Sequence, residues 1–136
     1  MATYVTNDVR RSRERIVEIS ADTTLTKADS GKTYMLDAVG EAITLPAVGT
    51  STGVKYKFIC STTAATTDWT IVAATSVIYG SAQVAGAVVA ASAENTITLV
   101  VAKFLPGDWV TLDCDGTNWY VEASVVTAAG CTFTDA

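Results

Sequence analysis

The sequence is dominated by short runs in which apolar and polar residues alternate, and the clearest pair lies in the last third of the chain. Residues 109–114 and 119–123 are rich in aromatic and β-branched residues, and the turn-forming residues 115–118 separate them. This pattern is typical of a β-hairpin. The hairpin carries two of the three tryptophans but no set of groups able to move a proton or bind a metal tightly. It therefore favours a structural or binding protein.

The rest of the chain after residue 20 follows the same rhythm. Pro46 ends one of these runs because it has no backbone N–H for a strand ladder. No convincing helix follows Ile19. Recurrence of short strands every 8 to 12 residues is typical of sandwiches and barrels. We expect an all-β fold, a small antiparallel sandwich or barrel of jelly-roll or tulip-like topology, with further strands at residues 24–26, 33–37, 42–45, 54–60, 68–73, 77–79 and 95–102.

An uncharged stretch covers residues 70–93. Polar residues and glycines interrupt it and it lacks Leu and Phe, so we do not expect a membrane span. Its low-complexity part, residues 82–93, fits either a long loop of small residues packed under a neighbouring subunit or a pair of weak strands. Gly86 and the length favour the loop.

The chain divides into an N-terminal arm, residues 1–19, and a β-rich domain, residues 20–136. A chain of 136 residues has about the size of one domain with a substantial core. The arm fits a short helix capped by Asp8, with Arg10 and Glu14 paired four residues apart. It equally fits a disordered or extended segment that orders only against a partner.

The net charge is −5, which disfavours non-specific binding to nucleic acid or anionic lipid. The charge is uneven, because the concentrated cationic group lies in the arm and the remaining chain is acidic. Clustered guanidinium groups bind carboxylates or phosphates in a bidentate manner. A protein partner with acidic patches fits this group better than nucleic acid does; its members are Arg10, Arg11, Arg13 and Arg15.

Several classes of enzyme chemistry lack their usual residues. The chain has no histidine, and hence lacks the commonest general base and transition-metal ligand. It has no glycine-rich phosphate loop. The three cysteines, Cys60, Cys114 and Cys131, are odd in number and widely spaced, so we expect buried reduced thiols. No secretory signal pattern opens the chain. We expect a protein that is not an enzyme and needs no cofactor.

The acidic residues of the hairpin permit two chemical interpretations. Alternate oxygens at Asp113, Asp115 and Asn118 resemble a calcium loop, but the bidentate glutamate of such loops is missing. We favour a hairpin turn in which Asp115 and Asn118 cap backbone amides and Gly116 takes a positive φ. A catalytic carboxylate pair drawn from Asp108, Asp113, Asp115 and Glu122 would need separated pKa values, and the sequence shows no burial pattern that would separate them. We expect no metal site.

The aromatic residues of the hairpin are the candidate anchors of the fold or of an assembly. Trp109, Trp119 and Tyr120 lie in alternating strands and fit core or subunit-interface positions. Exposed tryptophans could instead form a platform on which sugars stack. The same ambiguity applies to Trp69.

Three segments together carry a resemblance to a known family. They are SGKTYMLDA within residues 28–38, AITLPA at residues 42–47, and GDWV followed by DGTNWYV between residues 107 and 121. In combination they resemble the small β-rich capsid decoration proteins, of the cement or head-fibre-like kind, of tailed bacteriophages. The resemblance covers most of residues 20–126.

The resemblance implies a homotrimer seated on the outer surface of an assembled capsid, where it ties neighbouring major capsid protein subunits together and catalyses nothing. The protein would be made in the host cytoplasm and located on the virion, with Arg10, Arg11, Arg13 and Arg15 binding the capsid. Closed symmetry would also bury residues 82–93 and the surplus aromatic residues. The alternatives are a fibre-tip or surface adhesin that binds carbohydrate through exposed tryptophans and, third, a carboxylate hydrolase.

Overall fold

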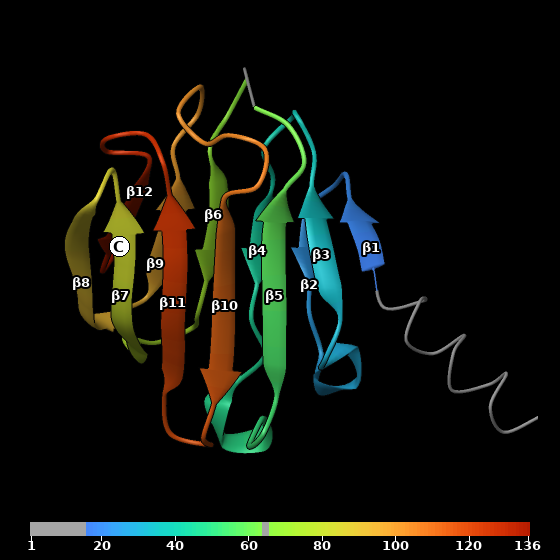
Figure 1. Ribbon diagram of the computed structural model, residues 1–136. Coiled ribbons are helices and arrows are strands. Elements are labelled where there is room, and N and C mark those ends of the chain that lie inside the picture. The colour runs from blue at the N-terminus through green and yellow to red at the C-terminus, as the bar shows by residue number, and fades with distance from the viewer. Residues whose placement is uncertain (1–15, 64–65) are drawn as a thin grey trace, which may run out of the picture.

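Two β-sheets form a sandwich in the computed structural model, which describes residues 16–63 and 66–136 (Figure 1). The front sheet has seven strands in the order β1 (Ile16–Ile19), β3 (Thr33–Leu36), β5 (Lys55–Cys60), β10 (Trp109–Cys114), β11 (Trp119–Val125), β7 (Ile78–Val84) and β8 (Ala87–Glu94). The second sheet has five, in the order β12 (Cys131–Thr134), β9 (Thr96–Leu99), β6 (Trp69–Val72), β4 (Ala42–Thr44) and β2 (Thr23–Thr24). The expectation of an all-β sandwich is confirmed.

The sheets are mixed, which departs from the expected antiparallel arrangement. Five of the ten strand pairs are parallel: β1–β3, β3–β5, β2–β4, β4–β6 and β7–β11. From β1 to β7 the chain alternates between the two sheets with every step. Each strand of one sheet is therefore reached by way of a strand in the other, and successive strands within a sheet run in the same direction. The predicted hairpin of β10 and β11 is antiparallel, as expected.

Alternating side chains of both sheets fill the space between them. An aromatic group occupies the seven-stranded side, where Tyr34 stacks on Phe58 with ring centroids 5.6 Å apart and Tyr56 stacks on Trp119 at 5.7 Å. Trp69 of β6 is fully buried on the other side, and its indole N–H donates to the carbonyl of Asp37 at 3.0 Å. Such offset aromatic pairs add about 0.5–1.5 kcal/mol each to the stability that burial supplies.

Residues 82–93 form most of a hairpin, so the expectation of a loop is wrong. β7 and β8 pair antiparallel and are joined by Ala85 and Gly86, with φ values of 51° and 82°. Two successive residues with positive φ are the mark of the type I′ turn that suits a two-residue hairpin. The inward-facing residues of the hairpin include Ala82, Val84 and Ala91, whose small side chains leave a weak hydrophobic pattern.

The boundary of the β-domain lies earlier than expected. Residues 16–19, assigned from the sequence to the arm, form β1 and pair in parallel with β3. Ile19 belongs to the core with 3% of its surface exposed. A helix extending to Ile19 is therefore wrong for these four residues, whereas residues 1–15 lie outside the described part of the chain. The helical segments of the described residues are two 3-10 turns, η1 (Lys27–Asp29) and η2 (Val48–Thr50), and no helix there is long and apolar enough to cross a membrane.

Candidate functional site

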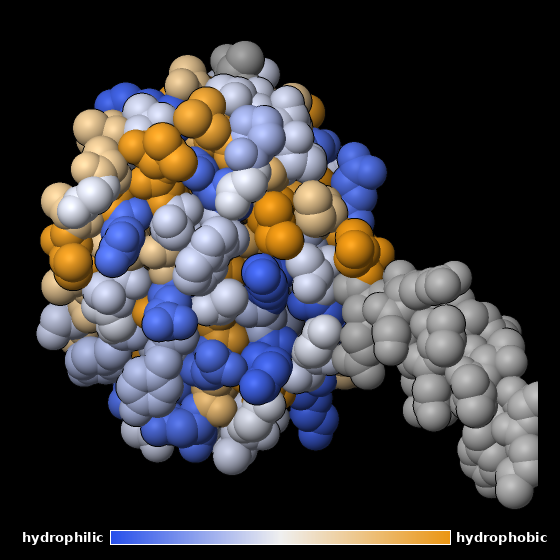
Figure 2. Space-filling view, in the orientation of Figure 1, coloured by the Kyte–Doolittle hydropathy of each residue, from blue (hydrophilic) through white to orange (hydrophobic). Residues whose placement is uncertain are grey.

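The outer face of the seven-stranded sheet carries the side chains that alternate with the core. Hydrophilic residues gather over the lower middle of this face, whereas hydrophobic ones lie near both sides and in its upper part (Figure 2). Strand register aligns the outward side chains of β5, β10, β11 and β7 in rows. Three rows run across these strands: Ile59, Trp109, Ser124 and Gln83; Lys57, Thr111, Glu122 and Ser81; Lys55, Asp113, Tyr120 and Tyr79.

Trp109 stands on this face between two different environments. On the β5 side, the Lys57 ammonium nitrogen lies 6.0 Å from the centre of the indole ring, at the outer limit of a cation–π contact. On the β11 side, the indole borders a pocket of about 270 Å³. The pocket is lined by Ser81, Gln83, Trp109, Glu122, Ala123 and Ser124. The half-buried indole of Trp109 thus forms one wall of this pocket, and polar side chains line the rest of it.

The other predicted aromatic anchors have different positions. Trp119 is fully buried against Tyr56, which places it in the core, and Trp69 is buried too. Tyr120 is 44% exposed and therefore does not belong to the core. Its hydroxyl donates a hydrogen bond to Asp115 at 2.9 Å. A contact of Trp109 or Tyr120 with a second subunit stays a prediction.

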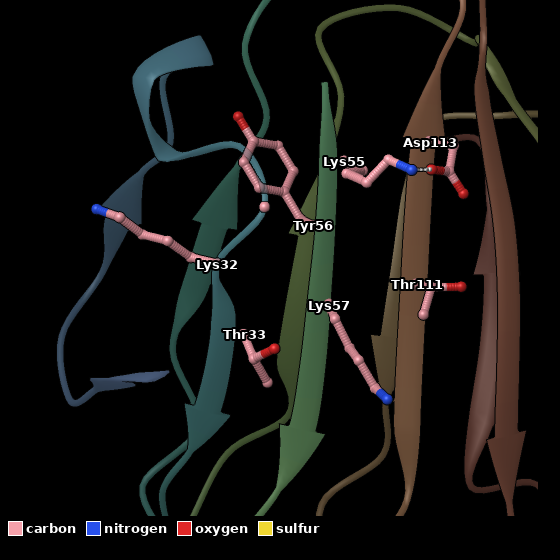
Figure 3. A pocket seen from close by; sticks show the side chains of 8 residues that line it. Lys32, Thr33, Lys55, Tyr56, Lys57, Thr111 and Asp113 are labelled. Carbon is pink, nitrogen blue, oxygen red and sulfur yellow. Dashed lines mark ion pairs between the residues drawn. The ribbon is translucent and has the colours of Figure 1, made fainter. Parts of the chain in front are cut away.

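A second pocket of about 290 Å³ lies over β3, β5 and β10, and three lysines line it (Figure 3). Two of them are paired: Lys32 with Asp29 at 3.1 Å and Lys55 with Asp113 at 3.7 Å. Figure 3 shows the Lys32 amine turned away from β5 and the Lys57 amine extending toward β10. The three ammonium groups therefore diverge, and this pocket does not present a convergent anion site.

The turn between β10 and β11 has the Asp115 cap and the positive φ at Gly116 that the sequence favoured, but Asn118 takes part through its backbone N–H and carbonyl groups rather than as a side-chain cap. One carboxylate oxygen of Asp115 accepts the backbone N–H groups of Thr117 and Asn118, both at 2.8 Å, and Gly116 has a φ of 93°. The Asn118 N–H, followed by that of Thr117, lowers the pKa of Asp115. Among residues 16–63 and 66–136 no three His, Cys, Asp or Glu side chains come together in a group that could hold a metal ion.

The remaining candidate carboxylates serve different local roles. Asp108 is buried, and its oxygens accept the backbone N–H groups of Leu105 at 2.8 Å and Val126 at 3.3 Å. It therefore joins the loop before β10 to the loop after β11. Asp113 and Glu122 are exposed on the outer face, on neighbouring strands. Glu122 is the carboxylate beside Trp109.

The three cysteines are buried free thiols, as expected. Burial, together with the nearby Asp108 carboxylate, raises the pKa of Cys60 and of Cys131 to about 12. Thiolates are the reactive form of cysteine, so these groups are held in their unreactive state.

β8, the last strand of the seven-stranded sheet, forms an uncharged edge over all but its final residue. Val88 on this strand and Val126 in the loop after β11 are 70% and 69% exposed. Natural sheets usually protect such edges with charges, proline or bulges, because an open edge pairs readily with another chain. Here Glu94 supplies a charge only at the end of the strand.

Threonines cover the outer face of the five-stranded sheet. The inward positions of β9, such as Ile97 and Leu99, are buried, so the alternate residues face outward. Register aligns these outward residues with their equivalents on β12, β6 and β4. The strands on this face contribute no charged side chain; its threonines are Thr24, Thr44, Thr70, Thr96, Thr98, Thr132 and Thr134.

Sequence reasoning located Trp109 and Glu122 but missed Ser81, Gln83 and Ser124 beside them. Ser81 and Gln83 approach Glu122 and Ser124 only through the parallel pairing of β7 with β11, and no local signal announces that pairing. Arg10, Arg11, Arg13 and Arg15 lie outside the described residues. Comparison with protein-family models, curated proteins and solved structures found no match.

Proposed function

We propose that this protein is a structural component of a tailed-phage virion. As a homotrimer it binds the outer surface of the assembled capsid and stabilises the shell by bridging major capsid protein subunits. Two things support the proposal: the sequence resemblance to capsid decoration proteins, and an all-β sandwich in which two of the candidate carboxylates hold a loop and a turn. Asp108 and Asp115 are both engaged with backbone N–H groups in this way.

The observation that carries the proposal is that the two edges of the seven-stranded sheet, β1 and β8, differ in character and lie far apart. The arginine-bearing residues 1–15 lead directly into β1 at one edge of the seven-stranded sheet, and the uncharged strand β8 forms the other. Six strand spacings of about 4.8 Å place these edges about 29 Å apart. A protein that assembles through one edge therefore keeps the other free to hold a second partner.

Self-association through β8 would pair the backbone N–H and C=O groups of this edge strand with a second copy and would cover the exposed Val88. Its outward side chains Val88 and Ala90 are small and uncharged, so no charge has to be desolvated when a second copy docks on them. This assigns to the hairpin of residues 82–93 the role in trimer formation that the sequence suggested.

Binding to the capsid would gain its strength from avidity. Three arginine arms on one trimer act at high effective concentration once the first has docked, and the gain can reach about 10²-fold or more. Because the trimer binds the assembled lattice and not separate subunits, mass action shifts the equilibrium toward the assembled shell.

Capsid binding is tested with undecorated capsids and three proteins: the full chain, a chain lacking residues 1–15, and a variant with Arg10, Arg11, Arg13 and Arg15 changed to Ala. The truncation stops before β1 because Ile19 is a core residue. Co-sedimentation should show saturation by the full chain and loss of most binding by the other two at equal thermal stability. Binding of the full chain should weaken as salt rises toward about 0.5 M, because salt screens exposed ion pairs.

Equal saturation by all three proteins would refute a contact through the arm. The contact would then have to lie on the body, and the uncharged threonine face would be examined first with Thr98→Lys. Failure of every protein to bind any capsid would refute the proposed function itself.

The trimer is tested separately by light scattering. The full chain should have three times the monomer mass at micromolar concentration, and Val88→Lys on β8 should reduce the mass to that of a monomer. Val39→Lys is the matched control, because Val39 is also an exposed valine, at 47%, but lies between β3 and β4 away from the edge. A monomeric full chain, or a trimeric Val88→Lys variant, would contradict assembly through β8.

A further inference from the structure

The pocket beside Trp109 has the shape and chemistry of a small carbohydrate site. We propose that Trp109, Ser81, Gln83, Glu122 and Ser124 bind a single pyranose ring on the outer face of the seven-stranded sheet. The site lies in the middle of the sheet, away from the edges β1 and β8, and does not depend on capsid binding. It would give a virion-surface protein a second, glycan-directed contact.

The indole of Trp109 provides the wall. Of the three tryptophans, only Trp109 reaches the surface, because Trp69 and Trp119 are fully buried. Lys57 approaches Trp109 from β5, whereas the pocket lies on the opposite side, over β11 and β7. The C–H groups of a pyranose form an apolar face that packs on an aromatic ring, and no Lys or Arg of residues 16–63 and 66–136 lines the pocket beside the indole.

The polar side chains provide the floor. Ser124 lies directly across from Trp109 in the strand register, and Gln83 lies beside Ser124. Glu122 and Ser81 form the next pair, two residues along the same strands. The four side chains span about 4.8 Å between strands and about 6.8 Å along them, which matches the spread of hydroxyl groups around one sugar ring.

The donor and acceptor types favour a sugar over other small ligands. A carboxylate accepts two hydroxyl hydrogens, an amide both donates and accepts, and serine hydroxyls do either. Vicinal hydroxyl groups, which also donate and accept, are the complement of such a set. Among the described residues Glu122 forms no ion pair, so its carboxylate is available to hydroxyl groups.

The size of the pocket limits the ligand. Its volume of about 270 Å³ is just below the range of about 300–1,000 Å³ typical of sites for drug-sized ligands. One ring fits, and a longer glycan would extend from Glu122 along its row toward Thr111. A site this open binds one sugar weakly, and in a trimer three such sites would act together on a glycan-coated surface.

The test uses the indole N–H signals of the ¹⁵N-labelled full chain, one for each tryptophan. Methyl glycosides of glucose, galactose, mannose and N-acetylglucosamine are added up to 50 mM. For at least one glycoside, the signal that disappears in Trp109→Phe should shift with saturation, while those of Trp69 and Trp119 stay in place. Glu122→Ala combined with Gln83→Ala should weaken binding at least tenfold.

Tyr120→Ala is the matched control, since Tyr120 is an exposed aromatic residue in another row of the same face. It should leave glycoside binding unchanged. The absence of a saturable shift with all four glycosides would overturn the proposal. So would unchanged affinity in the Glu122 and Gln83 double variant, or dissociation of the trimer in a folded Trp109→Ala protein, which would assign the indole to a subunit interface.

Discussion

Gly80 is the position where a single methyl group should do most damage to the front sheet. It lies in β7, opposite Val121 of β11 in the parallel pair that joins the β7–β8 hairpin to the rest of the sheet. Its φ is 138°, a conformation that residues with a side chain rarely adopt. A Cβ built there would overlap the backbone carbonyl oxygen of Val121.

The expected cost of Gly80→Ala has two parts. The backbone conformation alone costs an alanine about 1–3 kcal/mol. Relief of the overlap requires the two backbones to move apart, which by comparison with overpacked cores costs about 1–3 kcal/mol more. We therefore expect a loss of about 2–6 kcal/mol in the free energy of unfolding, with the β7–β8 hairpin loosened first.

Two other glycines separate these contributions. Gly86 has a φ of 82° but open space around its built Cβ, so Gly86→Ala should cost only about 1–2 kcal/mol, the price of a left-handed alanine. Gly49 has neither a positive φ nor a neighbour within 4 Å, and Gly49→Ala should stay within about 0.5 kcal/mol. Urea unfolding followed by tryptophan fluorescence measures all three. If Gly80→Ala were no worse than Gly86→Ala, the close approach to Val121 would be refuted.

Four further predictions concern the core, a turn, the thiols and the hairpin carboxylate. Trp119→Ala should cost about 3–5 kcal/mol in urea unfolding, whereas half-buried Trp109→Ala should cost less than about 2; equal losses would contradict their different burial. Ala85→Asn should raise stability by up to about 1 kcal/mol, because Asn tolerates the φ of 51° better than Ala does; a lower melting temperature would count against the type I′ turn. The pKa of about 12 for Cys60 and Cys131 means that the folded state retains protons that the unfolded state loses from about pH 9, so stability should fall as pH rises from about 9 toward 12. In the same protein at pH 8, iodoacetamide should modify these thiols only after urea is added, and rapid labelling without urea would disprove their burial. EDTA should leave the melting temperature unchanged, since the oxygens of Asp115 already accept hydrogen bonds from Thr117, Asn118 and Tyr120; a clear decrease would reveal a metal site.

The sequence predicted the parts of the fold that depend on neighbouring residues. Strict alternation in residues 54–60 and 109–114 indicated strands, and both segments form them as β5 and β10. The turn chemistry of Asp115 and Gly116 likewise specified the β10–β11 hairpin. These signals are local, because a strand exposes every second side chain and a tight turn demands particular backbone angles.

Local signals failed where a turn or a strand is built from residues that are unusual for that structure. The turn of the β7–β8 hairpin consists of Ala85 and Gly86 rather than the usual Asn-Gly, so the tract of residues 82–93 looked like a loop. Residues 16–19 looked like the end of an arm because Ile16 and Val17 lie among arginines and glutamates, and only pairing with β3 reveals them as a strand.

Strand direction and the neighbours of Trp109 were decided by the tertiary structure alone. Composition and alternation predicted an all-β sandwich or barrel, buried thiols and a hairpin after residue 108, and the structure decided for the sandwich. The alternation pattern of a strand is the same whether its neighbour runs parallel or antiparallel. It shows which face of the strand is buried but not which strand lies beside it. The parallel pairing of β7 with β11 joins Ser81 and Gln83 to Glu122 and Ser124, residues about forty positions apart in the chain. Such contacts depend on how the two sheets fill one common core, and no segment of the sequence contains that information by itself.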